Sequence, residues 1–150
     1  MLTVDTPGAR RPRATPDPGI CIAAAPGVHT NPRRTLALAQ GAYFLATGIW
    51  PLVHMSSFLR VTGHKRDLWL VRTVGALIAV TGATILSAAQ RDRITGEIAF
   101  LAAGSAGALG AVDTIYTSRG RIPPVYLLDA VAEAGLVALW LGLSRGQPQA

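Results

Sequence analysis

Residues 126–140, Tyr-Leu-Leu-Asp-Ala-Val-Ala-Glu-Ala-Gly-Leu-Val-Ala-Leu-Trp, are apolar enough to cross a lipid bilayer, apart from two acids. Asp129 and Glu133 lie four residues apart, so a helix places both on one face. An acid in hydrocarbon is costly unless it is paired, protonated or hydrated. The pair therefore marks either a polar interior site or a structural ion pair on a membrane-spanning helix.

The composition of the whole chain is typical of a membrane protein. Half of the 150 residues are apolar and 15% are charged, the mean hydropathy is positive, and the apolar residues come in long blocks. A chain of this length holds four spans and leaves no room for a separate soluble enzyme domain. The net charge of +6 comes from basic residues that flank apolar blocks, which favours contact with membrane lipids and argues against nucleic acid.

The sequence predicts an all-α integral membrane protein, a four-helix bundle that runs up-down-up-down after a disordered N-terminal tail. Residues 1–32 contain six of the ten prolines and no apolar periodicity, which is typical of a disordered basic tail. The membrane domain is predicted at 33–146 and a polar C-terminal tail at 147–150. Within the domain, spans are expected at about 34–54, 68–90, 96–117 and 124–143.

Capping residues set these boundaries. Asn31-Pro32 provides an N-cap and a proline at the first helical position. Asp67 and Thr95 are expected to cap the second and third spans, and Gly120 to end the third. Residues 56–61 are expected to form a short interfacial segment after the first span.

Small residues indicate which helices pack closely. Residues 102–111 are almost all small, so we expect the third span to be central in the bundle. Gly75, Ala79 and Gly82 allow close approach to the second span. In a homodimer, this face would be expected at the interface.

Basic residues suggest the orientation. With four spans, the N-terminal tail, the second loop and the C-terminus share one side of the membrane. That side carries eight basic residues, against six on the other with Arg72 included, which favours both termini in the cytoplasm. The abundance of Ala, Gly and Arg hints at a GC-rich bacterial genome, so the predicted location is a bacterial cytoplasmic membrane.

Charged residues of the spans converge at one depth. In an up-down bundle, the end of one span lies beside the start of the next. Arg72, Asp113 and Asp129 each lie about one turn, or about 5 Å, inside this side of the bundle, and Glu133 lies one turn deeper. The same rim contains four further side chains: Trp50, His54, Tyr116 and Tyr126. These eight residues predict a pocket for a ligand or for protons.

The charge count leaves two interpretations open. Arg72 paired with Asp113 or Asp129 would fix the helix register. With three acids and one arginine, however, at least one carboxyl has no dedicated cation, and Glu133 is the deepest of them. The sequence therefore supports both a functional pocket and a purely structural cluster.

The remaining polar and aromatic residues predict no metal, no cofactor and no catalytic residue. His54 and His64 lack metal-ligand spacing, and Ser105 has no histidine at its depth and is expected to bond to its own helix. Cys21 is the only cysteine and lies in the tail, which excludes an intramolecular disulfide or a redox pair.

Residues near the span ends have simpler explanations. The tryptophans at 50, 69 and 140 fit an interfacial belt. Gln40 and Glu97 lie at the opposite side of the bundle from the acids and need no special role.

Two stretches carry longer motifs. They are Gly48-Ile-Trp-Pro-Leu52 with Ser57-Phe58, Val61-Thr-Gly63, Lys65, Asp67 and Trp69-Leu-Val-Arg-Thr-Val-Gly75, and then Asp113-Thr-Ile-Tyr116 with Gly120-Arg-Ile-Pro-Pro-Val-Tyr-Leu-Leu-Asp-Ala130 and Glu133. This pattern resembles a family of uncharacterised small bacterial membrane proteins with four spans. The resemblance implies the four-span architecture and brings no known activity.

The three buried acids also look like those of the eukaryotic sterol-isomerase and sigma-2-receptor group. Those proteins are four-span bundles with acidic residues inside a lipid-facing cavity. The likeness rests on span count and on Asp113, Asp129 and Glu133, and architecture alone assigns no function.

Four functions are compatible with these patterns. The first is binding of a small amphipathic, cationic or lipid-derived molecule, with Glu133 and Asp129 as anionic anchors. The second is a transporter or proton relay, which requires a homodimer, and the third is an accessory or scaffold subunit of a larger membrane complex. An isomerase with Glu133 and with Asp129 or His54 as acid and base has the least support.

Overall fold

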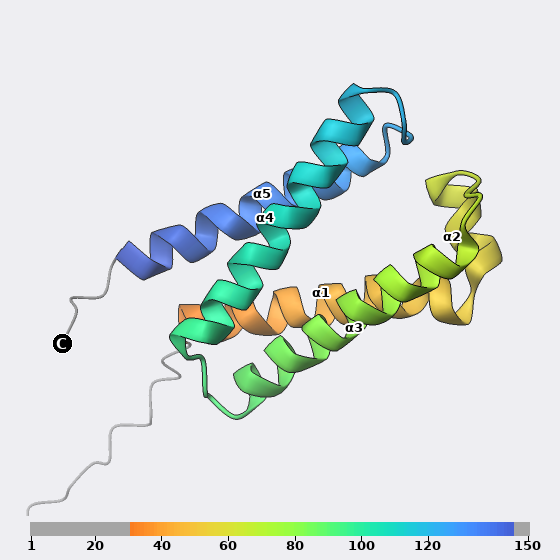
Figure 1. Cartoon of the computed structure of the whole chain (residues 1–150). Helices are drawn as coiled ribbons and strands as arrows, with labels where there is room; N and C mark the ends of the chain where they lie inside the picture. Colours follow the sequence, from red (N-terminus) through yellow and green to blue (C-terminus); the bar gives the residue numbers. More distant parts are fainter. Residues whose placement is uncertain (1–30, 146–150) are drawn as a thin grey trace, which may run out of the picture.

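The computed structural model describes residues 31–145, and within this range the protein is all-helical. The predicted tails, up to residue 30 and from 147 to 150, lie outside the described residues. The five helices are α1 (Pro32–Val53), α2 (Met55–Thr62), α3 (Leu68–Gln90), α4 (Gly96–Ser118) and α5 (Tyr126–Arg145) (Figure 1).

Four helices, α1, α3, α4 and α5, are long and apolar enough to cross a membrane. They contain 20 to 23 residues each, and about 20 residues of helix match the thickness of the hydrocarbon core. This confirms the predicted class to the extent that the described residues are all-helical and form four helices capable of spanning a membrane. It indicates an integral membrane protein.

Local signals explain where several helices begin and end. The Asn31 side chain accepts a hydrogen bond of 3.1 Å from Arg33 N, as an N-cap does. Gly120 has a φ of 63° and ends α4 as predicted. Asp67 and Thr95 occupy the N-cap positions of α3 and α4, as predicted, although neither side chain bonds to its helix backbone.

Helices α1 and α3 pack with their backbones in contact. A Cβ on Gly48 would lie 2.6 Å from Gly75 O, and a Cβ on Gly82 would lie 2.8 Å from Gly41 O. Real side chains do not approach that closely, so these positions require glycine. The face containing Gly75 and Gly82 is buried inside the chain, and it is not available for the dimer interface considered from the sequence.

Helices α4 and α5 form the second pair, and α4 is not central. Gly104 and Ala108, in the small-residue run of α4, are exposed. Helix α1 has the largest buried share of the four long helices and contacts α2, α3 and α5. The predicted central position of the third span is therefore wrong, because small residues permit close packing without enforcing it.

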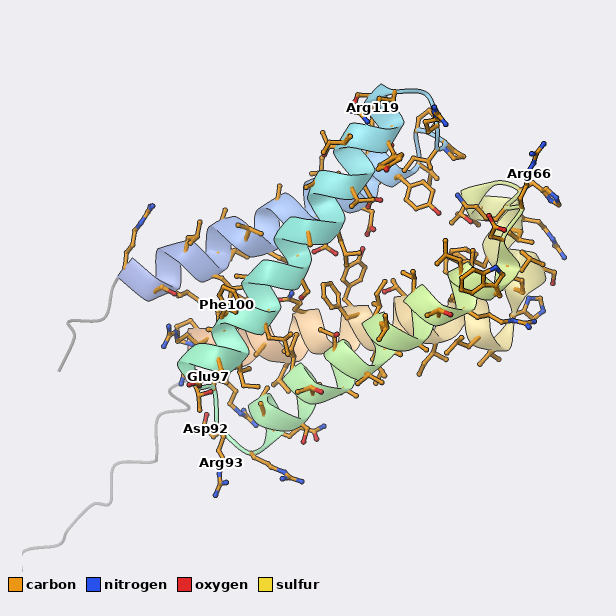
Figure 2. The ribbon with its side chains drawn as sticks, in the orientation of Figure 1. Arg66, Asp92, Arg93, Glu97, Phe100 and Arg119 are labelled. Carbon is orange, nitrogen blue, oxygen red and sulfur yellow. The ribbon has the colours of Figure 1, made fainter. Side chains whose placement is uncertain are left out.

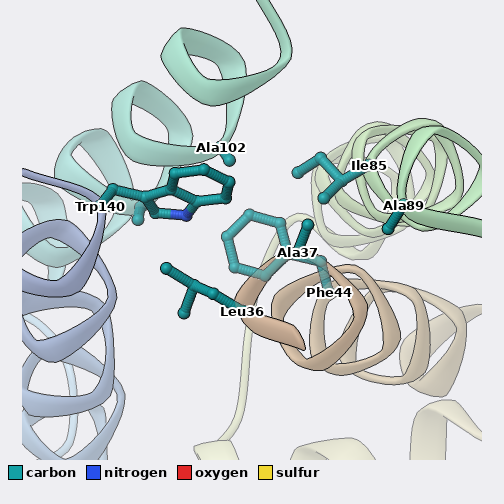
Figure 3. Packing of buried hydrophobic residues seen from close by; sticks show 8 residues of the cluster. Leu36, Ala37, Phe44, Ile85, Ala89, Ala102 and Trp140 are labelled. Carbon is teal, nitrogen blue, oxygen red and sulfur yellow. The ribbon is translucent and has the colours of Figure 1, made fainter. Parts of the chain in front are cut away.

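The two pairs meet at one end of the molecule and diverge toward the end that contains α2 (Figure 1). Figure 3 shows the buried cluster at the closed end. Its members come from all four long helices: Leu36, Ala37, Phe44, Ile85, Ala89, Ala102, Ala106 and Trp140. Trp140 is only 1% exposed, so its predicted place in an interfacial belt is wrong.

Candidate functional site

A pocket of about 640 Å³ lies between the two helix pairs. All five helices line it, together with the α2–α3 and α4–α5 loops. Most lining residues are apolar or aromatic. The charged side chains in the described lining are Lys65, Asp113, Asp129 and Glu133.

The pocket brings together five of the eight residues predicted from the sequence. They are Trp50, Asp113, Tyr126, Asp129 and Glu133. The acids converge because α4 and α5 are neighbours and each acid lies one or two turns from the α4–α5 loop. The similar depth of the three acids on neighbouring helices therefore brings them to one pocket.

The other three predicted residues, His54, Arg72 and Tyr116, are exposed and do not line this pocket. Neighbours of Arg72 on α3, Val71 and Val74, do line it. Successive residues of a helix point about 100° apart, so equal depth does not guarantee an equal direction. The structure does not bring Arg72 to the acids, and the predicted pairing is not made.

His54 has a structural position instead. It lies between α1 and α2, and its Nδ1 accepts a hydrogen bond of 3.2 Å from Ser57 N. This contact caps the start of α2. The imidazole is thus directed to a backbone amide outside the pocket lining.

Glu133 is the most buried of the charged groups in the pocket. Its side chain is 1% exposed, and its Oε2 has no hydrogen-bond partner among residues 31–145. Gly110 on α4 faces it, because a Cβ at Gly110 would lie 3.1 Å from the Glu133 Cβ. A buried carboxyl oxygen without a partner is unfavourable, so Glu133 presents an unsatisfied acceptor to a mainly apolar pocket.

Asp129 differs from Glu133 because it has a partner. The Tyr43 hydroxyl donates a hydrogen bond to Asp129 Oδ1 and joins α1 to α5. The sequence prediction missed Tyr43. The spacing of Tyr43, Thr47 and Trp50 could have identified it. Residues at this spacing share one face of a helix, and all three line the pocket.

Lys65 is the second residue that the prediction missed. Its Nζ lies 4.7 Å from the centre of the Tyr126 ring, in a cation–π contact between the α2–α3 loop and α5. In the same loop, Gly63 packs against Pro123, because a Cβ at Gly63 would lie 2.9 Å from Pro123 Cγ. These two contacts join the loops at the α2 end of the pocket. Lys65 lies in a loop, outside the spans from which the site was predicted.

Other candidate chemistry finds no support in the described part of the chain. Between residues 31 and 145, no group of three or more His, Cys, Asp or Glu side chains has a geometry that could hold a metal ion. Ser105 donates hydrogen bonds to carbonyls of its own helix, including one of 2.6 Å to Leu101 O, which confirms its predicted packing role.

The chain matches no protein-family model, no curated protein and no solved structure. The two resemblances noted from the sequence therefore stay predictions.

Proposed function

We propose that this protein binds a small amphipathic molecule with a cationic group, in the pocket between its two helix pairs. The observation that carries this proposal is the buried carboxyl of Glu133, which faces the pocket without a hydrogen-bond partner in residues 31–145. A ligand ammonium would both neutralise this carboxyl and hydrogen-bond to it.

The rest of the pocket fits such a ligand. A volume of about 640 Å³ lies within the range of small-molecule sites, which are mostly apolar with a few polar groups. Trp50 and Tyr126 supply aromatic surface, and the contact of Lys65 with the Tyr126 ring is an example of an ammonium accepted there. The apolar walls would bury the hydrocarbon part of the ligand.

The membrane setting is part of the proposal. The four long helices cross a bacterial cytoplasmic membrane up-down-up-down, with the N-terminal tail and the C-terminus in the cytoplasm, as the positive-inside rule favours. In this orientation, the α2–α3 and α4–α5 loops lie on the outer side. The pocket then lies in the outer half of the membrane.

A purely structural role for the acids has less support. A scaffold subunit would be expected to bond each buried acid within the protein or to a partner subunit. Asp129 has such a bond to Tyr43, whereas Glu133 has none within residues 31–145.

A proton relay is the second candidate function, because Asp113, Asp129 and Glu133 line the same pocket. It predicts proton flux in liposomes that Glu133→Gln lowers and Glu97→Gln does not. Equal flux through both variants would remove the reason for this alternative.

Binding can be tested with a fluorescent alkylamine and protein in lipid nanodiscs. We expect Glu133→Gln to weaken binding about tenfold or more, because a charge-assisted hydrogen bond is lost. The matched control is Glu97→Gln, which makes the same chemical change at an exposed site. Glu97 lies in the first turn of α4 (Figure 2) and does not line the pocket. Equal affinity of both variants for the alkylamine would contradict the proposed function.

A further inference from the structure

Two groups of opposite charge lie at different depths in the pocket, and neither forms an ion pair within the described residues. Lys65 forms no ion pair or side-chain hydrogen bond with the residues from 31 to 145. Its ammonium lies over the Tyr126 ring, and Asp113 is within electrostatic reach of it. Glu133 Oε2 likewise has no hydrogen-bond partner in that range. Tyr126 and Glu133 are seven residues apart on α5, which corresponds to about 10 Å along the helix.

We propose that the ligand is bipolar, with an ammonium that binds Glu133 and an anionic group that binds Lys65, joined by an apolar spacer of about 10 Å. Long ω-amino carboxylates and aminoalkyl phosphates belong to this chemical class. The inference rests on the proposed function and specifies the ligand of the same pocket.

The aromatic wall of the pocket favours an apolar spacer. The Trp50 and Phe58 rings meet edge to face with their centres 5.6 Å apart, and both line the pocket. The Trp50 indole Nε1 already donates a hydrogen bond of 2.7 Å to Ser57 Oγ. This wall therefore offers hydrocarbon surface and no free indole donor, so a polar spacer would lose its hydrogen bonds to water.

The charge distribution fixes the direction of the ligand. Figure 2 shows Arg66 and Arg119 at the end of the molecule where the two loops lie, and both side chains are exposed. Together with Lys65 they attract an anionic group to this end. The reverse orientation would place the anion beside Asp129 and Glu133, where like charges repel.

The test uses 8-aminooctanoate, octylamine and octanoate as competitors of the fluorescent alkylamine in phosphatidylcholine nanodiscs. Because the three compounds partition differently into lipid, each is compared between wild-type protein and Lys65→Met. We expect Lys65→Met to weaken 8-aminooctanoate about tenfold and not to weaken octylamine, since only the former loses a charge-assisted contact. Lys65→Arg should retain the affinity for 8-aminooctanoate.

Arg60→Met is the matched control, because Arg60 is an exposed cation of α2 that does not line the pocket. It should leave the affinities for all three compounds unchanged. If Lys65→Met weakens both amines equally, or neither, the bipolar ligand is excluded while amine binding, and hence the proposed function, stands. If neither amine nor the fluorescent alkylamine binds wild-type protein, both proposals fail.

An anionic lipid headgroup is the other source of a negative charge at Lys65. Repeating the competition in nanodiscs with anionic lipid separates the two. If octylamine binds more tightly in anionic nanodiscs and Lys65→Met abolishes this gain, the anion at Lys65 is a lipid headgroup. That result would overturn the proposal of a single bipolar ligand. Unchanged octylamine affinity would support it.

Discussion

Trp140 Nε1 donates a hydrogen bond of 2.7 Å to Gln40 Oε1, across 100 positions of the sequence. The Gln40 amide in turn donates a hydrogen bond of 2.8 Å to Ala102 O. One side chain, fully buried, thus joins α1 to both α4 and α5 at the closed end of the molecule. The pocket forms because these hydrogen bonds hold the two helix pairs together at the closed end, while the pairs diverge toward the end that contains α2.

Gln40→Leu is expected to lower the free energy of unfolding by about 2 kcal/mol, because the buried Trp140 N–H loses its acceptor. Adding Trp140→Phe removes this orphaned donor, so the double variant should lose less than the sum of the single losses. Unfolding in mixed micelles measures these differences. The control is Gln90→Leu at the exposed end of α3, and strictly additive losses would contradict the contact.

Tyr43→Phe is expected to lower the free energy of unfolding by about 1 kcal/mol, because Asp129 loses the hydroxyl that ties it to α1. Tyr116→Phe removes the same hydroxyl from an exposed position of α4 and should change little. The same unfolding measurement compares the two. Equal effects would show that the Tyr43 hydroxyl makes no stabilising contact.

Glu133→Leu is expected to raise the free energy of unfolding of the ligand-free protein by about 1 kcal/mol, because it removes a buried carboxyl without a partner in the described range. Asp129→Leu should have the opposite sign, because it removes the acceptor of Tyr43. Thermal unfolding of both variants in the same lipid gives the two signs. Destabilisation by both would favour the structural interpretation of the acids.

Gly48→Ala is expected to lower the free energy of unfolding by about 2 kcal/mol or more, because the new methyl group would push α1 away from the α3 backbone. At Gly104, no atom of the described residues lies within 4 Å of an added Cβ, apart from the chain neighbours and the backbone of the same helix. Gly104→Ala should therefore stabilise α4 by up to about 1 kcal/mol. Chemical denaturation compares the two, and similar losses would argue against the backbone contact of α1 with α3.

The spans were predictable because each is a long apolar block, and the bundle's interior was predicted less well. The small-residue run of α4 indicated a central helix, yet α1 contacts more neighbours, because its glycines meet glycines on α3. Such matching depends on two distant segments at once. Trp140 was misplaced for a related reason, since its acceptor Gln40 lies on another helix.

The site was predictable to the extent that helical spacing determines it. Depth placed Asp113, Asp129 and Glu133 together, and they do line one pocket. Depth does not fix the rotation of α3, which turns Arg72 outward. Depth within a span cannot place a loop residue. Lys65, the cation in the described lining, lies in a loop and was therefore not predicted.

The contact of α1 with α3 also has a consequence for finding proteins of common descent. Gly41 and Gly48, like Gly75 and Gly82, are two helical turns apart, and each occupies a place that no larger residue fits. Acids that face a ligand can change when the ligand changes, whereas a larger residue at this backbone contact would destabilise the helix pair in every relative. In diverged relatives, we therefore expect two glycines seven residues apart on each of these helices to be conserved longer than the acids. These glycine pairs should identify homologues more reliably than the acids do.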